Sequence, residues 1–200
     1  MFSGIFEDAI EEDLIHSNPT QRILKRILPP RRQRNLKKAN PLTKDELGKF
    51  IQTAEKMSAV SWTEVLILKV MGYAGLRLGE TLSMRAENFD VQSYSYHVTE
   101  SFKVHKFGLP KKGKKRLVDL PKFLAVELSR YILHLKKRSL EDGKGGEVSL
   151  LFLDPTEKEY PYSQRKIQRL VFRVCRAAGL RIRHPHDLRH TYATLLLIPT

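Results

Sequence analysis

Two short stretches of the sequence combine residues that could act on a charged ligand. HPHDLRHTYAT, at residues 184–194, places His186 and Arg189 three residues apart, so on a helix an imidazole and a guanidinium would reach the same ligand. GLRLGETLSMR, at 75–85, places Arg77 directly after a glycine that can stop a helix, where a long basic side chain could clamp a phosphate. Taken alone, Arg77 is better interpreted as the cap of the preceding helix.

The histidines of the 184–194 stretch raise the question of a metal site, because His186 and His190 are four residues apart and His184 is near. No glutamate follows His186 as it does in the zinc-protease signature, and Asp187 would point elsewhere on a helix. We therefore predict no metal and interpret His190 as a packed core histidine. The single cysteine, Cys175, is expected to fill the core.

Basic residues outnumber acidic ones and are concentrated in runs. The chain of 200 residues has 36 Lys plus Arg against 22 Asp plus Glu, a net charge of +14. Residues 14–43 and 102–116 contain no acid, and residues 163–190 contain only Asp187. Three such runs favour one nucleic-acid surface over three separately solvated faces. The lysines within 108–121 could donate a proton, contact phosphates, or belong to a solvated turn.

Composition excludes several other classes of protein. With 41% hydrophobic residues the chain can form a core, which excludes a disordered basic tail. The first 13 residues hold five acids and no Lys or Arg, unlike a secretory signal, and a single cysteine fits a reducing compartment. The longest apolar stretch, 65–76, is interrupted by Lys69 and is too short to span a bilayer. We expect a cytoplasmic protein with no membrane partner.

Hydrophobic periodicity predicts an α+β fold that is mainly helical. A helix is expected to begin at Thr43, where Glu46 completes a capping box. Further helices are expected near 2–14, over 61–74, 79–84, 122–138 and 163–178, and from Pro185 onward. Alternation between 89 and 120 predicts a small antiparallel sheet whose hairpin tip is the lysine-rich segment. The proline-flanked, charged segment 29–40 is predicted to be an interdomain linker.

These motifs together resemble the tyrosine recombinase (phage integrase) family. GLRLGE resembles the first arginine box of that family, HDLRHTYAT its His-x-x-Arg box, and KKGKKRLVDLP its β-hairpin lysine segment. FEDAIEEDLIHSNPTQRI is similar to the last helix of the family's core-binding domain. The resemblance implies a core-binding remnant at 1–28, the linker at 29–40, and at 41–200 a catalytic domain of three-stranded-sheet type that lacks its C-terminal part.

The resemblance also implies a role for each site residue. Arg77 and Arg189 would hold the non-bridging oxygens of the scissile phosphate, and Lys111 would protonate the departing 5′ oxygen, with Lys112 as the alternative lysine. His186 would assist proton transfer at the nucleophile, and Glu80 would orient the Arg77 helix. No cofactor is implied. The expected partner is double-stranded DNA, and five basic residues are expected to contact it: Arg31, Arg32, Arg34, Lys114 and Lys115.

The sequence departs from the family pattern in one respect. The family's nucleophilic tyrosine lies a few dozen residues after the His-x-x-Arg box, whereas only eleven residues follow Arg189, and Tyr192 is one helical turn from it. We therefore expect a recombinase or integrase fragment that binds DNA without forming the 3′-phosphotyrosyl intermediate. Self-association on DNA is expected of the full-length parent, which could be a phage integrase, a transposon recombinase or a chromosome-dimer resolvase. The alternative is a non-catalytic DNA-binding or regulatory module that retains phosphate contacts.

Overall fold

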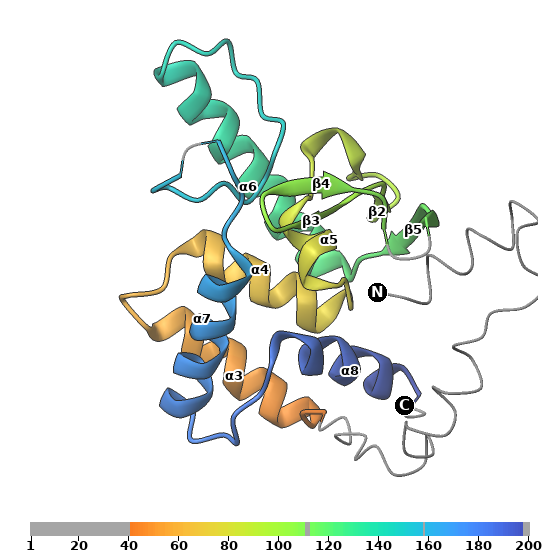
Figure 1. Ribbon diagram of the computed structural model, residues 1–200, viewed down its shortest axis with the longest axis vertical. Helices are drawn as coiled ribbons and strands as arrows, with labels where there is room; N and C mark the ends of the chain where they lie inside the picture. The colour runs from red at the N-terminus through yellow and green to blue at the C-terminus, as the bar shows by residue number, and fades with distance from the viewer. Residues whose placement is uncertain (1–40, 111–112, 158, 198–200) are drawn as a thin grey trace, which may run out of the picture. The chain divides into compact units, whose positions relative to one another are not determined.

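The computed structural model describes residues 41–110, 113–157 and 159–197, most of which are helical (Figure 1). The predicted helix at 2–14 and the linker at 29–40, with Arg31, Arg32 and Arg34, lie outside the described residues. The described helices are α3 (Lys44–Lys56), α4 (Trp62–Tyr73), α5 (Leu78–Leu82), α6 (Lys122–Glu141), α7 (Gln164–Ala177) and α8 (Pro185–Leu196), with a 3-10 turn, η2 (Ala86–Asn88).

The strands form two small antiparallel sheets. β1 (Phe89–Asp90), β2 (Ser95–Val98) and β5 (Arg116–Asp119) make a three-stranded sheet in the order β1-β2-β5, and β3 (Ser101–Lys103) pairs with β4 (Lys106–Gly108) as a hairpin. The predicted α+β class and its three-stranded sheet are therefore confirmed.

Local signals account for where the helices begin. Thr43 and Glu46 form the predicted capping box at α3: the Glu46 amide donates to the Thr43 hydroxyl, and Glu46 accepts from the Thr43 amide at 2.9 Å. Ser61 and Glu64 repeat this arrangement at α4. At α8, Pro185 occupies the first turn, where a missing amide hydrogen costs nothing.

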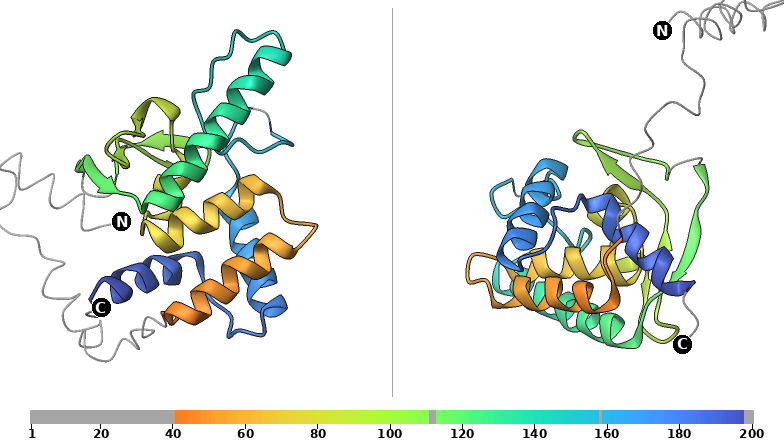
Figure 2. Two further views of the ribbon diagram at one scale, coloured as in Figure 1. Left: turned by 180° about the vertical axis from the view of Figure 1, so that it is seen from behind. Right: turned by 90° about the horizontal axis from the view of Figure 1, so that it is seen from below.

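Helix α4 is the centre of the packing. It is buried around most of its circumference and packs against α3, α5, α6 and α8. Its one basic residue, Lys69, is 8% exposed and bonds Glu55 of α3 and Glu127 of α6, both at 2.7 Å, so a buried charge joins three helices. In Figure 2, α6 and α7 lie on opposite sides of the α3 and α4 pair.

Helix α7 is strongly amphipathic. Its buried face contains Ile167, Leu170, Val174 and, as predicted, Cys175, which is fully buried. The opposite face is exposed and basic and carries Arg165, Arg169, Arg173 and Arg176. Its apolar stripe therefore fixes α7 on α3 and turns four arginines toward solvent.

The lysine-rich segment is placed differently from the prediction. It does not form the tip of a hairpin but connects β4 to β5, because the separate β3–β4 hairpin interrupts the chain between β2 and β5. The tip of that hairpin is Val104-His105, and both residues have positive φ, 48° and 57°. A two-residue turn of this kind is signalled by Asn-Gly or Asp-Gly, so Val-His gave no indication of it.

Candidate functional site: an arginine cluster

Arg77 and Glu80 meet at the start of α5. Arg77 directly precedes the helix, and its backbone N–H donates to Glu80 Oε2 at 3.0 Å. Its guanidinium NH1 also donates to Glu80 Oε1 at 2.8 Å. Glu80 is 1% exposed, whereas the side chain of Arg77 keeps 36% of its surface in contact with solvent. One carboxylate therefore caps α5 and directs an exposed guanidinium.

Arg116, the first residue of β5, forms an ion pair with the same carboxylate. Its NH1 donates to Glu80 Oε1 at 3.0 Å and its NH2 donates to Oε2 at 2.6 Å. This is the two-pronged geometry that a planar guanidinium forms with a carboxylate. Arg116 is not among the site residues predicted from the sequence. Its only signal was its place at the end of the acid-free run 102–116, and no local pattern pairs it with a residue 36 positions earlier.

Helix α8 brings Arg189 and His186 to the corner that carries Arg77. We call Arg77, Glu80, Arg116, His186 and Arg189 the arginine cluster. Arg189 NH1 donates to the carbonyl oxygen of Gly75, two residues before Arg77. His186 is one turn earlier on α8, and its ring contacts that of His190 edge to face, with centroids 4.5 Å apart. Thr191 fixes the helix to the core, because its Oγ1 accepts from the Leu42 amide at 2.8 Å. His190, interpreted from the sequence as a packed core histidine, is only partly buried, and its ring lies against the exposed His186.

The close approach of α8 to the 75–77 corner depends on Gly75. Gly75 has a φ of +62°, and a Cβ atom built on it would collide with the ring of Tyr192 on α8. A glycine alone satisfies both the left-handed backbone and the missing space. The ring of Tyr192 thus packs against the backbone that carries Arg77.

The neighbouring arginines change the pKa of Glu80. Burial raises the pKa of its carboxyl, but the hydrogen bonds from Arg116 and Arg77 outweigh burial and lower that pKa from 4.5 to about 2. Glu80 is therefore ionised at neutral pH. Two guanidinium groups, those of Arg77 and Arg116, pair with this single carboxylate, and Arg189 on the Gly75 carbonyl adds a third positive charge, so these four side chains carry a net charge of +2.

The pKa values of His186 and Arg189 on α8 are also lowered. Partial burial lowers the pKa of His186, and the neighbouring His190 and Arg189 lower it further, which favours the neutral imidazole. Burial also lowers the pKa of Arg189, with a smaller contribution from the charge of Arg77. The hydrogen bond from Arg189 to the Gly75 carbonyl brings α8 to the corner that carries Arg77. A neutral imidazole beside an excess of positive charge can accept a proton next to a bound anion.

The structure thus brings together four residues that the sequence analysis selected, Arg77, Glu80, His186 and Arg189, and adds Arg116. Lys111 and Lys112 lie outside the described residues. Lys114 and Lys115 are exposed in the segment that leads into β5. Among residues 41–110, 113–157 and 159–197, no three His, Cys, Asp or Glu side chains are grouped as a metal would require. Over that same part of the chain, no helix is both long and apolar enough to cross a membrane.

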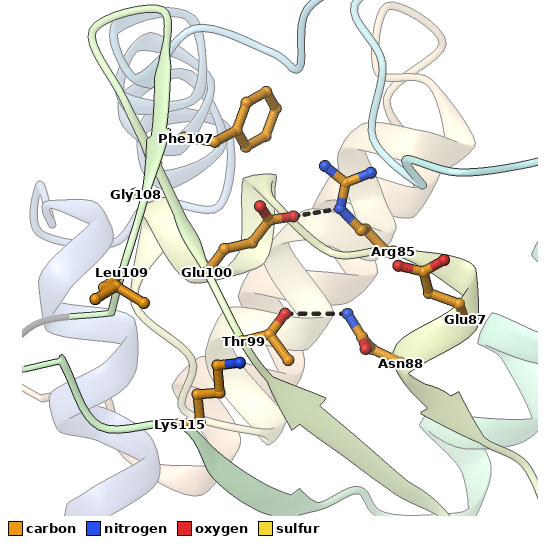
Figure 3. Close-up of a pocket in the computed structure, with 9 residues that line it drawn as sticks. All are labelled: Arg85, Glu87, Asn88, Thr99, Glu100, Phe107, Gly108, Leu109 and Lys115. Atoms are coloured by element: carbon orange, nitrogen blue, oxygen red, sulfur yellow. Dashed lines mark hydrogen bonds and ion pairs between the residues drawn. The ribbon is translucent and has the colours of Figure 1, made fainter.

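A separate open cleft of about 530 Å³ lies between the β3–β4 hairpin and the three-stranded sheet (Figure 3). Arg85 and Glu100 form an ion pair within it, and Asn88 donates to the Thr99 hydroxyl at 3.1 Å. Phe107 and Lys115 are also among its lining residues. None of the residues of the arginine cluster lines this cleft, so it is not the candidate active site.

Comparison with known proteins identifies the family of the chain. The model of the phage integrase family matches residues 40–198, so the chain belongs to this family. The tyrosine recombinase XerA of Thermococcus kodakarensis is 30% identical over 172 residues, which are 86% of this chain and 53% of that protein. The chain spans about half the length of the curated relatives it matches. The predicted resemblance to tyrosine recombinases is confirmed.

Two solved structures show the same architecture. The XerH site-specific recombinase bound to its palindromic difH substrate superposes with a TM-score of 0.57, is 27% identical, and is matched over 78% of this chain and 41% of its own. The Tn1549 transposon integrase in complex with transposon right-end DNA has a TM-score of 0.67 over 97% of this chain and 63% of its own. At 19% identity the second likeness shows the fold alone.

Proposed function

We propose that this chain carries the phosphate-binding part of a site-specific DNA recombinase or integrase, and that its described residues bind duplex DNA through the arginine cluster. The observation that carries the proposal is that Arg77 and Arg116 share the buried Glu80 carboxylate, while Arg189, one helical turn after His186 on α8, bonds the Gly75 carbonyl two residues before Arg77. An excess of fixed guanidinium groups suits a phosphate with negatively charged oxygens. The XerH structure was solved on DNA, which supports the same partner here.

In the proposed reaction, a tyrosine oxygen attacks the scissile phosphorus and forms a 3′-phosphotyrosyl bond while the bond to the 5′ oxygen breaks. Arg77 and Arg189 stabilise the charge on the two non-bridging oxygens, as paired guanidinium groups can without a metal. The neutral imidazole of His186 takes the tyrosine proton. Lys111, or Lys112 beside it, gives a proton to the leaving 5′ oxygen, and rejoining reverses these transfers.

The nucleophilic tyrosine is proposed to lie outside these 200 residues. Tyr192 is the one tyrosine that follows the His-x-x-Arg box, and its ring is packed against Gly75. These residues alone would then bind DNA and form no covalent link to it. Covalent trapping of the 200-residue chain on a nicked duplex would contradict this assignment. Self-association on DNA is proposed for the full-length protein, as is a cytoplasmic location.

The direct test of DNA binding is a salt titration with a labelled duplex of about 30 base pairs. Each phosphate that the protein neutralises contributes roughly −0.9 to the slope of log affinity against log salt, so three such contacts predict about a 40-fold loss between about 50 and 200 mM salt. An affinity that does not change with salt would exclude a phosphate-binding surface. Binding without cleavage by a full-length protein that has its tyrosine would favour the alternative, a DNA-binding module.

A further inference from the structure

The Glu80 carboxylate has its four hydrogen bonds divided between two arginines. Oε1 accepts from NH1 of Arg77 and NH1 of Arg116, and Oε2 accepts from the backbone N–H of Arg77 and NH2 of Arg116. Each oxygen therefore uses both of its lone-pair directions. The carboxylate cannot rotate without breaking bonds to one arginine or the other, so Arg116 limits the positions open to Arg77.

The two arginines come from different parts of the chain, and both bond this carboxylate. Arg77 and Glu80 lie at the start of α5, whereas Arg116 is held in the sheet by the pairing of β5 with β2, where it is opposite Val98. Arg116 also follows directly after the lysine-rich segment 111–115. A bond between Arg116 and Glu80 therefore ties the start of β5, and the lysine-bearing segment before it, to the helix that presents Arg77.

We propose that Arg116 is a positioning residue of the recombinase site: it locks Glu80, and through Glu80 it sets the direction in which the Arg77 guanidinium meets the phosphate. This inference rests on the proposed function. Arg116 acts on the phosphate through Glu80, to which both of its terminal nitrogens donate. Burial of Glu80 makes this engagement strong, since a buried carboxylate without its donors is costly.

Arginine is required at position 116 by the geometry. Two parallel hydrogen bonds at 3.0 and 2.6 Å need a planar fork, and a lysine ammonium offers a single point of contact. Arg116→Lys is therefore expected to keep the charge but restore only part of the function that Arg116→Gln removes. A residue that contributed charge alone would be fully replaced by lysine.

The test is a double-mutant cycle on the 200-residue chain, with inorganic phosphate at low ionic strength as the probe. The variants are Arg116→Gln, Glu80→Gln and the double variant, and Lys136→Gln on the exposed face of α6 is the control for loss of one charge. Phosphate affinity is read from the side-chain NMR resonances of Arg77 and Arg189. We expect Arg116→Gln to weaken phosphate binding about tenfold, the scale of one charged hydrogen bond, and Lys136→Gln to change it less than twofold.

The cycle separates the two ways in which Arg116 could act. In the Glu80→Gln background, Arg116→Gln should change phosphate affinity less than twofold, because the path through Glu80 is already broken. A further tenfold loss in that background would show direct contact with the anion and overturn the proposal. Full recovery with Arg116→Lys would overturn it too.

A readout without ligand separates this inference from the proposed function. In the free protein, Arg116→Gln should shift and broaden the Nε–H resonance of Arg77, whereas Lys136→Gln should leave it unchanged. If the wild-type chain bound neither phosphate nor duplex DNA, the proposed function would fail whatever this resonance did. If the chain bound both and the resonance did not respond, only the role of Arg116 would be wrong. Should Arg116→Gln unfold, Arg116→Lys provides the same comparison, with a smaller shift expected and an unchanged resonance again contradicting the role.

Discussion

Arg189 on α8 donates a hydrogen bond from its guanidinium to the carbonyl oxygen of Gly75, two residues before Arg77. The two arginines proposed to hold one phosphate are thus joined through a single stretch of backbone. Tyr192, three residues after Arg189, packs on the same glycine. The contact between α8 and this corner therefore decides whether the two guanidinium groups face one ligand.

Gly75→Ala should separate α8 from the corner. The added methyl group would meet the Tyr192 ring, and φ at +62° is unfavourable for alanine, so we expect a loss of about 2–4 kcal/mol in the free energy of unfolding. The matched control is Gly113→Ala. Gly113 has a φ of +66°, but a Cβ atom built on it would meet no atom within 4 Å beyond its two chain neighbours. Urea unfolding should show a cost of about 1 kcal/mol for that control. Equal costs for both variants would mean that contact with Tyr192 is unimportant.

The ion pairs of Glu80 predict how stability depends on pH. The pKa of Glu80 is lowered from 4.5 to about 2 in the folded protein, so its contribution to stability is complete above pH 4.5 and is lost as pH falls toward 2. Relative to Glu80→Gln, the wild-type chain should be about 3 kcal/mol more stable at pH 7. This difference should shrink below pH 4.5 and be gone near pH 2.

Chemical denaturation at a series of pH values measures that difference. Glu141→Gln, at an exposed glutamate whose nearest lysine nitrogen is 3.9 Å away, is the control and should differ little from wild type at any pH. A gap between wild type and Glu80→Gln that stayed constant from pH 7 to pH 2 would show that the ionised carboxylate is not what stabilises α5.

A substitution in the β3–β4 turn should increase the stability of the protein. Val104 has a φ of 48°, which a β-branched residue rarely adopts, and its side chain is 75% exposed, so it gives up no core packing when it is replaced. Val104→Asn is expected to raise the free energy of unfolding by about 1 kcal/mol, because asparagine tolerates the left-handed region. Val91→Asn, at an exposed valine outside the set of positive-φ residues, should bring no gain. Destabilisation by Val104→Asn would reveal a packing role for Val104.

Local sequence patterns predicted most of the helices because their starts and buried faces are encoded within a few residues. Thr43 with Glu46 and the apolar stripe of α7 are examples. The spacing of His186 and Arg189 likewise placed both residues on α8. These features depend on helix periodicity and capping, which can be read along the chain without knowledge of its partners.

The contacts that assemble the cluster could not be predicted in the same way. Arg116 meets Glu80 across 36 positions and Arg189 meets Gly75 across 114, and neither pairing leaves a periodic trace. The β3–β4 hairpin was missed because its turn, Val104-His105, lacks the residues that favour positive φ. The pairing of β3 with β4 closes that turn in spite of its local preference.

Arg77 and Arg189 are proposed to form the part of the surface that receives a DNA phosphate. The most direct measurement is the duplex affinity of Arg77→Gln/Arg189→Gln at fixed salt, compared with Lys136→Gln/Lys137→Gln. The control pair loses the same charge from the exposed end of α6, which projects away from α8 (Figure 1). We predict that the arginine variant binds at least about tenfold more weakly than wild type and the lysine variant within about twofold. Equal affinity losses in the two double variants would contradict the claim.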